Sequence, residues 1–279
     1  MVKLNINYVG NGKVVLIAGG GKVYTDVAAR FTKTEKSLDE ILASPYDKNI
    51  VKNIIEMGHL AATEFDYFIF GIEGYARVTE VQLVRKRIAN YLIKSGRVDK
   101  NGKRSFDMII PKGIEDFIIN YPISSDFIKI KNNNLSDVLG YQCEVNISLD
   151  CYEILSIIEN WYNTGIKKEI PEEDLRYMKP QATEFKAIIG MNTHSLLDFF
   201  RIRCCKNSQT EIRDLANKML KECKKVSPDL FKKAGSNCVH WGFCPENQYQ
   251  NKNCVGKILT HNDVINKIKN NFKENNIEN

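Results

Sequence analysis

The chain has 279 residues, of which 43% are hydrophobic and 27% are charged, an ordinary composition for a soluble protein. No apolar run is long enough to cross a membrane, and the first residues lack the apolar core of a signal peptide, so we expect a cytoplasmic protein. The net charge of +6 suits a phosphorylated small molecule, whereas nucleic-acid binding ranks last because no basic stripe interleaved with aromatic residues is present.

The first part of the chain predicts a strand followed by short helices. Residues 13–18 are typical of a buried strand, and the glycines at 19–21 follow it. Their spacing fits neither a P-loop nor a dinucleotide-binding fingerprint, so we interpret them as a turn. Ser37 and Glu40 have the spacing of a capping box, which predicts the start of a helix. Helices are also predicted at 27–31 and 46–58.

Residues 65–72 predict a strand with apolar side chains on both faces, typical of a strand covered on each side of its sheet. Residues 73–74 are expected to turn the chain into a helix. Four apolar residues at spacings of three and four predict one stripe along that helix, which Gly96 should end. The stripe consists of Val81, Val84, Ile88 and Tyr91.

The chain after residue 105 predicts two strands and several helices. Strict alternation at 141–149 is the cleanest strand signal in the chain, and residues 106–111 predict a strand that ends at a proline. A long amphipathic helix is expected at 211–226. Shorter helices are predicted at 152–162, after Pro171, from Ser195 and from Ser227 to Gly235. Residues 247–279 are polar and are expected to form a tail separate from one domain at 1–246, with a loose helix or disorder after about residue 260.

The eight cysteines are expected to be reduced thiols of a cytosolic protein. Cys238, His240, Cys244 and Cys254 could together hold zinc, but the spacing contains no Cys-x-x-Cys pair. Ordinary thiols are therefore favoured, and no metal site is predicted.

Nitrogen donors concentrate in residues 82–97. The donors are Gln82, Arg85, Lys86, Arg87, Lys94 and Arg97, with the hydroxyl of Ser95 among them. One interpretation is a solvated helix end, because cations suit the negative end of the helix dipole. The other is a phosphate clamp, in which planar guanidinium groups bind a phosphorylated ligand. Composition alone leaves both open.

The same stretch resembles the signature of the flavin-dependent thymidylate synthases, Arg-His-Arg-x-x-Ser-x-x-x-x-Ser-x-Arg. Arg85, Arg87, Ser95 and Arg97 match it in type and spacing. Further blocks resemble the family in the same order along roughly residues 13–246. These blocks are 55–60, 68–87, 176–180, 191–192, 195–200, 203–205, 211–220 and 238–246.

The resemblance implies an α/β fold with a curved mixed sheet and long helices, in a homotetramer whose active sites form between subunits. It implies FAD as cofactor, NADPH and methylenetetrahydrofolate as co-substrates, and conversion of dUMP, or a related pyrimidine nucleotide, to dTMP. By position, flavin would contact His59, Arg85 and Arg87. The nucleotide phosphate and uracil would be held by Gln82, Ser95, Arg97 and Arg203, of which Arg97 and Arg203 would be catalytic.

The chain also departs from the family pattern where cofactor and substrate would bind. Lys86 stands where the family has histidine, and Asn90 where it has the first serine. Asp198 stands where the family has an asparagine that helps hold the cofactor, and an added carboxylate could repel the cofactor pyrophosphate. Residue Phe65 and the segment 206–211 also differ.

Two alternatives follow from these departures. The first is a paralogue that keeps the flavin and folate chemistry but takes another pyrimidine nucleotide or makes a hydroxymethyl product. The second is a homologue that binds flavin and nucleotide without turnover.

Overall fold

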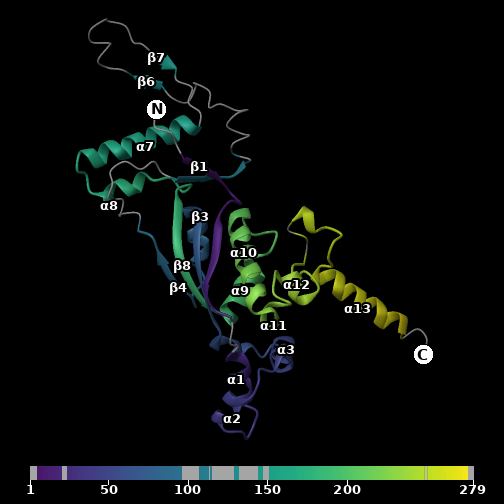
Figure 1. The fold of residues 1–279 in the computed structure, drawn as a ribbon. Coiled ribbons are helices and arrows are strands. Elements are labelled where there is room, and N and C mark those ends of the chain that lie inside the picture. Colours follow the sequence, from purple (N-terminus) through teal and green to yellow (C-terminus); the bar gives the residue numbers. More distant parts are fainter. Residues whose placement is uncertain are drawn as a thin grey trace, which may run out of the picture. The chain divides into compact units, whose positions relative to one another are not determined.

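The computed structural model describes residues 5–20, 24–95, 107–112, 114, 129–131, 144–146, 151–247, 249 and 251–275. These residues form a mixed α/β fold with two compact units, each with its own core (Figure 1). None of the described helices combines the length and the apolar character needed to traverse a membrane.

The first unit takes its described residues from Met1–Asn11, Gly74–Val78 and Lys94–Phe185. Strands β1 and β5 pair in parallel, and strands β6 and β7 pair antiparallel. A core of Met108, Ile110, Leu155, Tyr162 and Leu175 joins β5 to the helices. The elements are β1 (Asn5–Tyr8), β5 (Asp107–Ile110), β6 (Lys129–Lys131), β7 (Glu144–Asn146), α7 (Cys151–Lys167), α8 (Glu172–Leu175) and η3 (Arg176–Met178).

Most predictions for this unit are confirmed. The strand expected at 106–111 is β5, and the helix expected after Pro171 is α8. The helix expected at 152–162 is α7, which continues to Lys167. Only Glu144–Asn146 of the strand expected at 141–149 lies within the described residues.

The second unit, which takes its residues from Gly12–Glu73, Thr79–Ile93 and Lys186–Asn279, contains most of a four-stranded sheet in the order β2-β3-β8-β4. Strand β2 pairs antiparallel with β3, and β4 pairs antiparallel with β8. The strands are β2 (Lys13–Ala18), β3 (Tyr67–Ala76), β8 (Glu184–Asn192) and β4 (Asn90–Ile93). One face of this sheet packs against helices, with α10 lying along β2 (Figure 1).

The helices of this unit fall into two groups. The first group lies between β2 and β3 in the chain: α1 (Tyr24–Phe31), α2 (Leu38–Ala43), α3 (Lys48–Met57) and η1 (Leu60–Phe65). The second follows β8: α9 (Thr193–Arg203), α10 (Thr210–Val226), α11 (Pro228–Phe231), α12 (Asn237–Trp241), η4 (Lys252–Cys254) and α13 (His261–Asn275).

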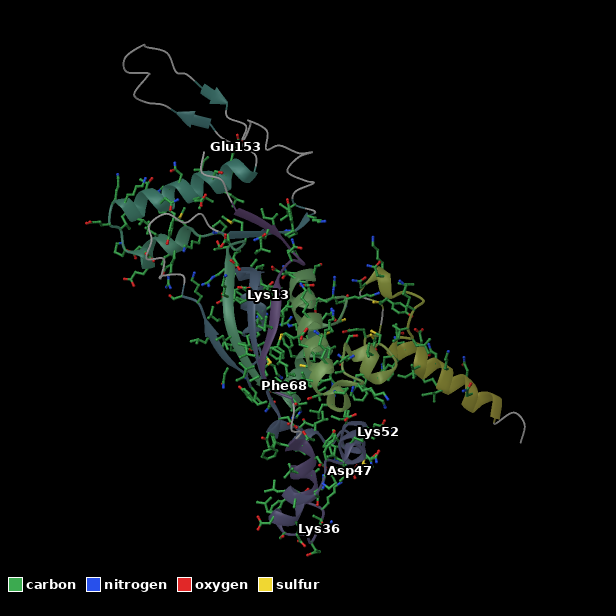
Figure 2. All side chains as sticks on the ribbon, viewed as in Figure 1. Lys13, Lys36, Asp47, Lys52, Phe68 and Glu153 are labelled. Atoms are coloured by element: carbon green, nitrogen blue, oxygen red, sulfur yellow. The ribbon has the colours of Figure 1, made fainter. Side chains whose placement is uncertain are left out.

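The core of the second unit forms where β3 meets the helices that follow β8. Phe68, labelled in Figure 2, lies edge-on to Phe231 with ring centroids 5.4 Å apart, and Phe231 in turn meets Phe200 at 6.1 Å. The apolar side of α10 is fully buried, as its pattern predicted. It consists of Ile212, Leu215, Met219 and Cys223.

The glycines after β2 form a tight turn, as expected. Gly19 has φ 120°, and a Cβ there would lie 2.7 Å from the carbonyl oxygen of Tyr67. Gly20 has φ 78°, and a Cβ there would lie 2.6 Å from Val226. Both positions need glycine for backbone geometry and for close packing, which accounts for the glycines without any bound nucleotide.

Three predictions about the sheet are wrong. Strand β2 exists, but Val15 and Ile17 are 44% and 56% exposed, so it is not buried. In β3 only the face with Phe68, Phe70 and Ile72 is buried, while Tyr67 on the other face is 42% exposed. Residues 73–74 do not end the strand, since β3 continues to Ala76.

The predicted helix at the donor-rich stretch is also wrong beyond its first turns. Helix α4 spans Arg77–Leu83 only, and Asn90–Ile93 is strand β4. Val81, Val84 and Ile88 are exposed, so they form no buried stripe. Pairing of Tyr91 with Ile189 and of Leu92 with Ile188 in β8 overrides the helical spacing, because β8 supplies backbone partners that a sequence pattern cannot reveal.

The helices predicted from Ser37, at 46–58 and from Ser195 are α2, α3 and α9, and the helix predicted at 27–31 is part of α1. The capping box at Ser37 is present, because its side chain accepts from the Glu40 amide and Glu40 accepts from the Ser37 amide. The helix expected to close at Gly235 ends earlier, at Phe231. The tail forms helix α13 from His261.

Candidate functional site

The segment between α4 and β4, residues 84–89, is here called the basic turn because it contains Arg85, Lys86 and Arg87. The Tyr91 hydroxyl shapes the turn by contacting the carbonyl oxygens of Leu83 at 2.9 Å and Lys86 at 3.0 Å. Burial raises the pKa of Tyr91 to about 12, so this hydroxyl remains a protonated donor at neutral pH.

Helix α9 contacts the basic turn at Lys86 and the end of α4 at Gln82. The Lys86 ammonium lies 2.5 Å from the Asp198 carboxylate, with the Lys86 side chain 21% exposed. Five residues further along the helix, Arg203 Nη2 donates to the Gln82 carbonyl oxygen at 3.0 Å. The Gln82 side chain donates to Gln209, at the N-terminal end of α10.

The two guanidinium groups of Arg85 and Arg203 lie close enough to interact. Burial lowers the pKa of Arg203, and the positive charge of Arg85 lowers it further. Within the described part of the chain, no carboxylate pairs with Arg85, Arg87 or Arg203. Like charges held together without an acid are stabilised by a bound anion, and planar guanidinium groups match the oxygen pairs of phosphate.

Helix α4 rests on a buried hydrogen bond to α10. The Thr79 hydroxyl donates to the Glu211 carboxylate at 2.5 Å, and Thr79 and Glu211 are 0% and 2% exposed. This contact ties the first part of α4 to α10, and the basic turn follows α4 in the chain. The Thr79–Glu211 contact is buried, whereas Arg85 and Arg87 on the basic turn are exposed.

His59 lies elsewhere in the second unit, beside a cavity of about 400 Å³. Helices α1, α2 and α3 with their connecting segments enclose this cavity, and Figure 2 labels Lys36 and Asp47 in these segments. Its cationic lining residues are Arg30, Lys33 and Lys36, and its lining includes no Asp or Glu. The cavity can therefore accept an anionic or polar group next to an imidazole.

Arg30 differs from the other cations of this cavity because it already has a partner. It forms an ion pair with Asp26, which is 2% exposed, and donates to the Pro45 carbonyl oxygen at 2.6 Å. This pairing raises the pKa of Arg30. Asp26 also accepts from the Asp47 amide at 3.2 Å, so the pair ties α1 to the start of α3.

The structure thus brings some of the predicted site residues together and not others. Gln82, Arg85 and Arg203 form one cluster, with Arg87 exposed on the same basic turn. His59 lines the cavity, and none of those four residues does so. Ser95 is exposed beyond β4. Arg97 lies outside the described residues.

Sequence reasoning missed three features of the site. Gln209 partners Gln82, Lys86 partners Asp198, and three basic residues line the His59 cavity. The spacing of Arg30, Lys33 and Lys36 by three was a usable signal for the last of these. The two pairings join positions 127 and 112 residues apart, and no local pattern could have revealed them.

The predicted repulsion of an anion by Asp198 assumed a carboxylate without a partner. The ion pair with Lys86 neutralises it, so both departures from the family pattern are accounted for by one contact. Among the described residues, no group of His, Cys, Asp and Glu is arranged to hold a metal ion.

Comparisons with known proteins agree on one family. The family model described as thymidylate synthase complementing protein matches residues 16–229. A flavin-dependent thymidylate synthase of Clostridium tetani is 35% identical over 250 residues, covering 88% of this chain and 90% of the relative. Another, from Sulfolobus acidocaldarius, is 32% identical over 239 residues, covering 84% and 81%. A third, from Nitratidesulfovibrio vulgaris, is 33% identical over 199 residues, covering 71% and 72%.

Proposed function

The chain belongs to the thymidylate synthase complementing protein family, and on that premise we propose that it is a flavin-dependent thymidylate synthase, an FAD-dependent enzyme that methylates dUMP to dTMP. Methylenetetrahydrofolate is the proposed methylene donor, NADPH the proposed reductant, and the cytoplasm the proposed location. We also propose a domain at 1–246 followed by the tail 247–279.

One observation supports this function above the others. Arg85 and Arg203 come from segments more than a hundred residues apart and are held close together without an acidic partner among the described residues. Two like charges held close together repel, and a bound anion offsets that repulsion. A nucleotide phosphate or a dinucleotide pyrophosphate supplies the required charge and geometry.

The residues present fit an FAD pyrophosphate and a ring system. Arg85 and Arg87 are the proposed phosphate contacts, and His59 is the proposed contact at the cavity. FAD, when bound, supplies hydride chemistry, and the protein supplies binding and orientation. The ion pair of Lys86 with Asp198 leaves the charges of Arg85 and Arg87 available to the cofactor.

Toward the nucleotide, Gln82, Ser95, Arg97 and Arg203 are the proposed contacts. An arginine beside the O2 or O4 edge of uracil stabilises negative charge on the ring, which makes C5 a better nucleophile without proton transfer. Arg203 is suited to this role because its guanidinium is fixed by the Gln82 carbonyl oxygen at one nitrogen and keeps other donors for a ligand.

A homotetramer with a curved sheet is proposed from the exposed face of the four-stranded sheet. That face carries a row of apolar side chains between 42% and 71% exposed: Val15, Ile17, Tyr67, Leu92 and Ile188. Contiguous apolar surface of this kind is usually covered in the assembled protein. A second copy of the chain is the proposed cover, and sedimentation of the purified protein at a mass of about four chains is the expected result.

The decisive experiment is the absorbance spectrum of the freshly purified protein, before and after addition of FAD and then dUMP. We expect a flavin spectrum that dUMP perturbs, followed by dTMP formation when NADPH and methylenetetrahydrofolate are supplied. Colourless protein that takes up no FAD would overturn the proposal.

A further inference from the structure

The ion pair between Lys86 and Asp198 joins the middle residue of the basic turn to the middle of α9. The ammonium nitrogen lies 2.5 Å from the carboxylate, and the Lys86 side chain is 21% exposed while that of Asp198 is 47% exposed. Lys86 is therefore committed to a protein partner, unlike Arg85 and Arg87, which flank it.

The backbone of the turn is held on its other side by Tyr91. Its hydroxyl lies 3.0 Å from the Lys86 carbonyl oxygen, and the Lys86 amide donates to the Leu83 carbonyl oxygen at 3.3 Å. Lys86 thus has its amide, its carbonyl and its ammonium fixed at once. A residue fixed at three atoms sets the direction in which its neighbours project.

We propose that Lys86 and Asp198 are positioning residues that pin the basic turn to α9, so that Arg85 and Arg87 face the anionic cofactor while Lys86 does not contact it. This rests on the proposed function in one respect, namely that FAD is the ligand whose binding the arginines serve. The alternative is that Lys86 is itself a cofactor-binding cation and Asp198 merely restrains it.

The two ideas predict opposite results for Asp198→Asn. If Lys86 binds the cofactor, freeing it from Asp198 should tighten FAD binding. If the pair is a pin, loss of either partner loosens the turn, so Lys86→Met and Asp198→Asn should each raise the Kd for FAD about fivefold. The double variant should be no worse than the weaker-binding single variant, because both remove the same contact.

Rescue variants separate positioning from general damage to the fold. Lys86→Arg should retain FAD affinity, and the charge exchange Lys86→Asp with Asp198→Lys should restore part of it, because the pair reforms with the partners reversed. Lys225→Met is the matched control, since it breaks an ion pair with Glu222 on α10, away from the basic turn. It should leave FAD affinity unchanged.

Amide hydrogen exchange of residues 84–90 in the cofactor-free protein tests the pin without FAD. Both single variants should speed exchange there about fivefold, and the charge exchange should slow it again. If the wild-type protein binds no FAD, the proposed function is wrong. The exchange rates still test whether the ion pair between Lys86 and Asp198 holds the basic turn to α9. Tighter FAD binding by Asp198→Asn, additive effects of the two single variants, or unchanged exchange in both would overturn the inference.

Discussion

The second unit has two cationic regions that are built in opposite ways. At the basic turn and the neighbouring end of α9, Arg85 and Arg203 lie close together without an acidic partner in the described residues. At the His59 cavity, the walls enclose about 400 Å³, but Arg30 is already neutralised by Asp26. One region has unsatisfied charge and the other has enclosed space.

We infer from this difference that catalysis depends on the arginines at the basic turn and that shape recognition depends on the cavity. Charge that is unpaired in the folded protein can be used to stabilise charge on a ligand, because its desolvation cost is already met by the fold. The charge of Arg30, which is paired with Asp26 within α1, instead maintains the shape of a cavity. We therefore expect removal of an arginine to have a different effect in each region, on catalysis at the basic turn and on stability at the cavity.

The largest expected effect is at Arg203. Arg203→Ala should lower kcat/KM for dTMP formation by roughly 10²- to 10³-fold, the cost of removing one donor that stabilises a developing negative charge. The free energy of unfolding should fall by only about 1 kcal/mol, since the variant loses one hydrogen bond to the Gln82 carbonyl oxygen. Steady-state kinetics with a urea titration measure both quantities.

His59→Ala is the comparator for this prediction at the cavity. Its expected loss in kcat/KM is about tenfold, because the imidazole contributes one contact at the edge of the enclosed space. Arg203→Lys should fall between wild type and Arg203→Ala, since a point charge cannot reproduce the planar fork. Equal losses for Arg203→Ala and His59→Ala would remove the distinction between the two regions.

The next effect is on stability, at Arg30. Arg30→Met should lower the free energy of unfolding by about 3 kcal/mol, because it leaves the buried carboxylate of Asp26 without its cation. Urea unfolding followed by far-ultraviolet circular dichroism measures it. Lys33→Met is the control from the same cavity and should change the free energy of unfolding by less than about 0.5 kcal/mol. Similar losses in the two variants would mean that the ion pair does not maintain the cavity.

A helix was predictable from the sequence where the apolar spacing within that helix alone determines which of its sides is buried. In α10 the spacing of Ile212, Leu215 and Met219 places all three on one side, and all three are fully buried. The same reasoning failed for Val81, Val84 and Ile88, whose spacing is helical but which are exposed. There the chain leaves the helix to pair with β8, and that pairing depends on a segment a hundred residues away.

The candidate site was predictable only in part for a related reason. The donors of the basic turn are local in sequence, and a collinear resemblance indicated which of them to consider. Their state depends on distant partners, such as Asp198 for Lys86 and Gln82 for Arg203. A substitution considered alone, such as Asp198 for asparagine, therefore suggested repulsion where the fold supplies a neutral pair.

The smallest expected effect is at the helix that contributes one wall of the cavity. Ser37 caps α2, which supplies Ile41 to the lining, and its side chain accepts from the Glu40 amide. Ser37→Ala should lower the free energy of unfolding by about 1 kcal/mol. It should weaken FAD binding by less than about threefold, because it acts only through the wall of the cavity. The kcat, which depends on the arginines at the basic turn, should not change. Ser37→Thr keeps the capping hydroxyl and should behave as wild type in the same urea and FAD titrations. A large loss of kcat in Ser37→Ala would mean that the cavity and the arginine cluster act as one site, because a cap on α2 has no direct contact through which to reach Arg203.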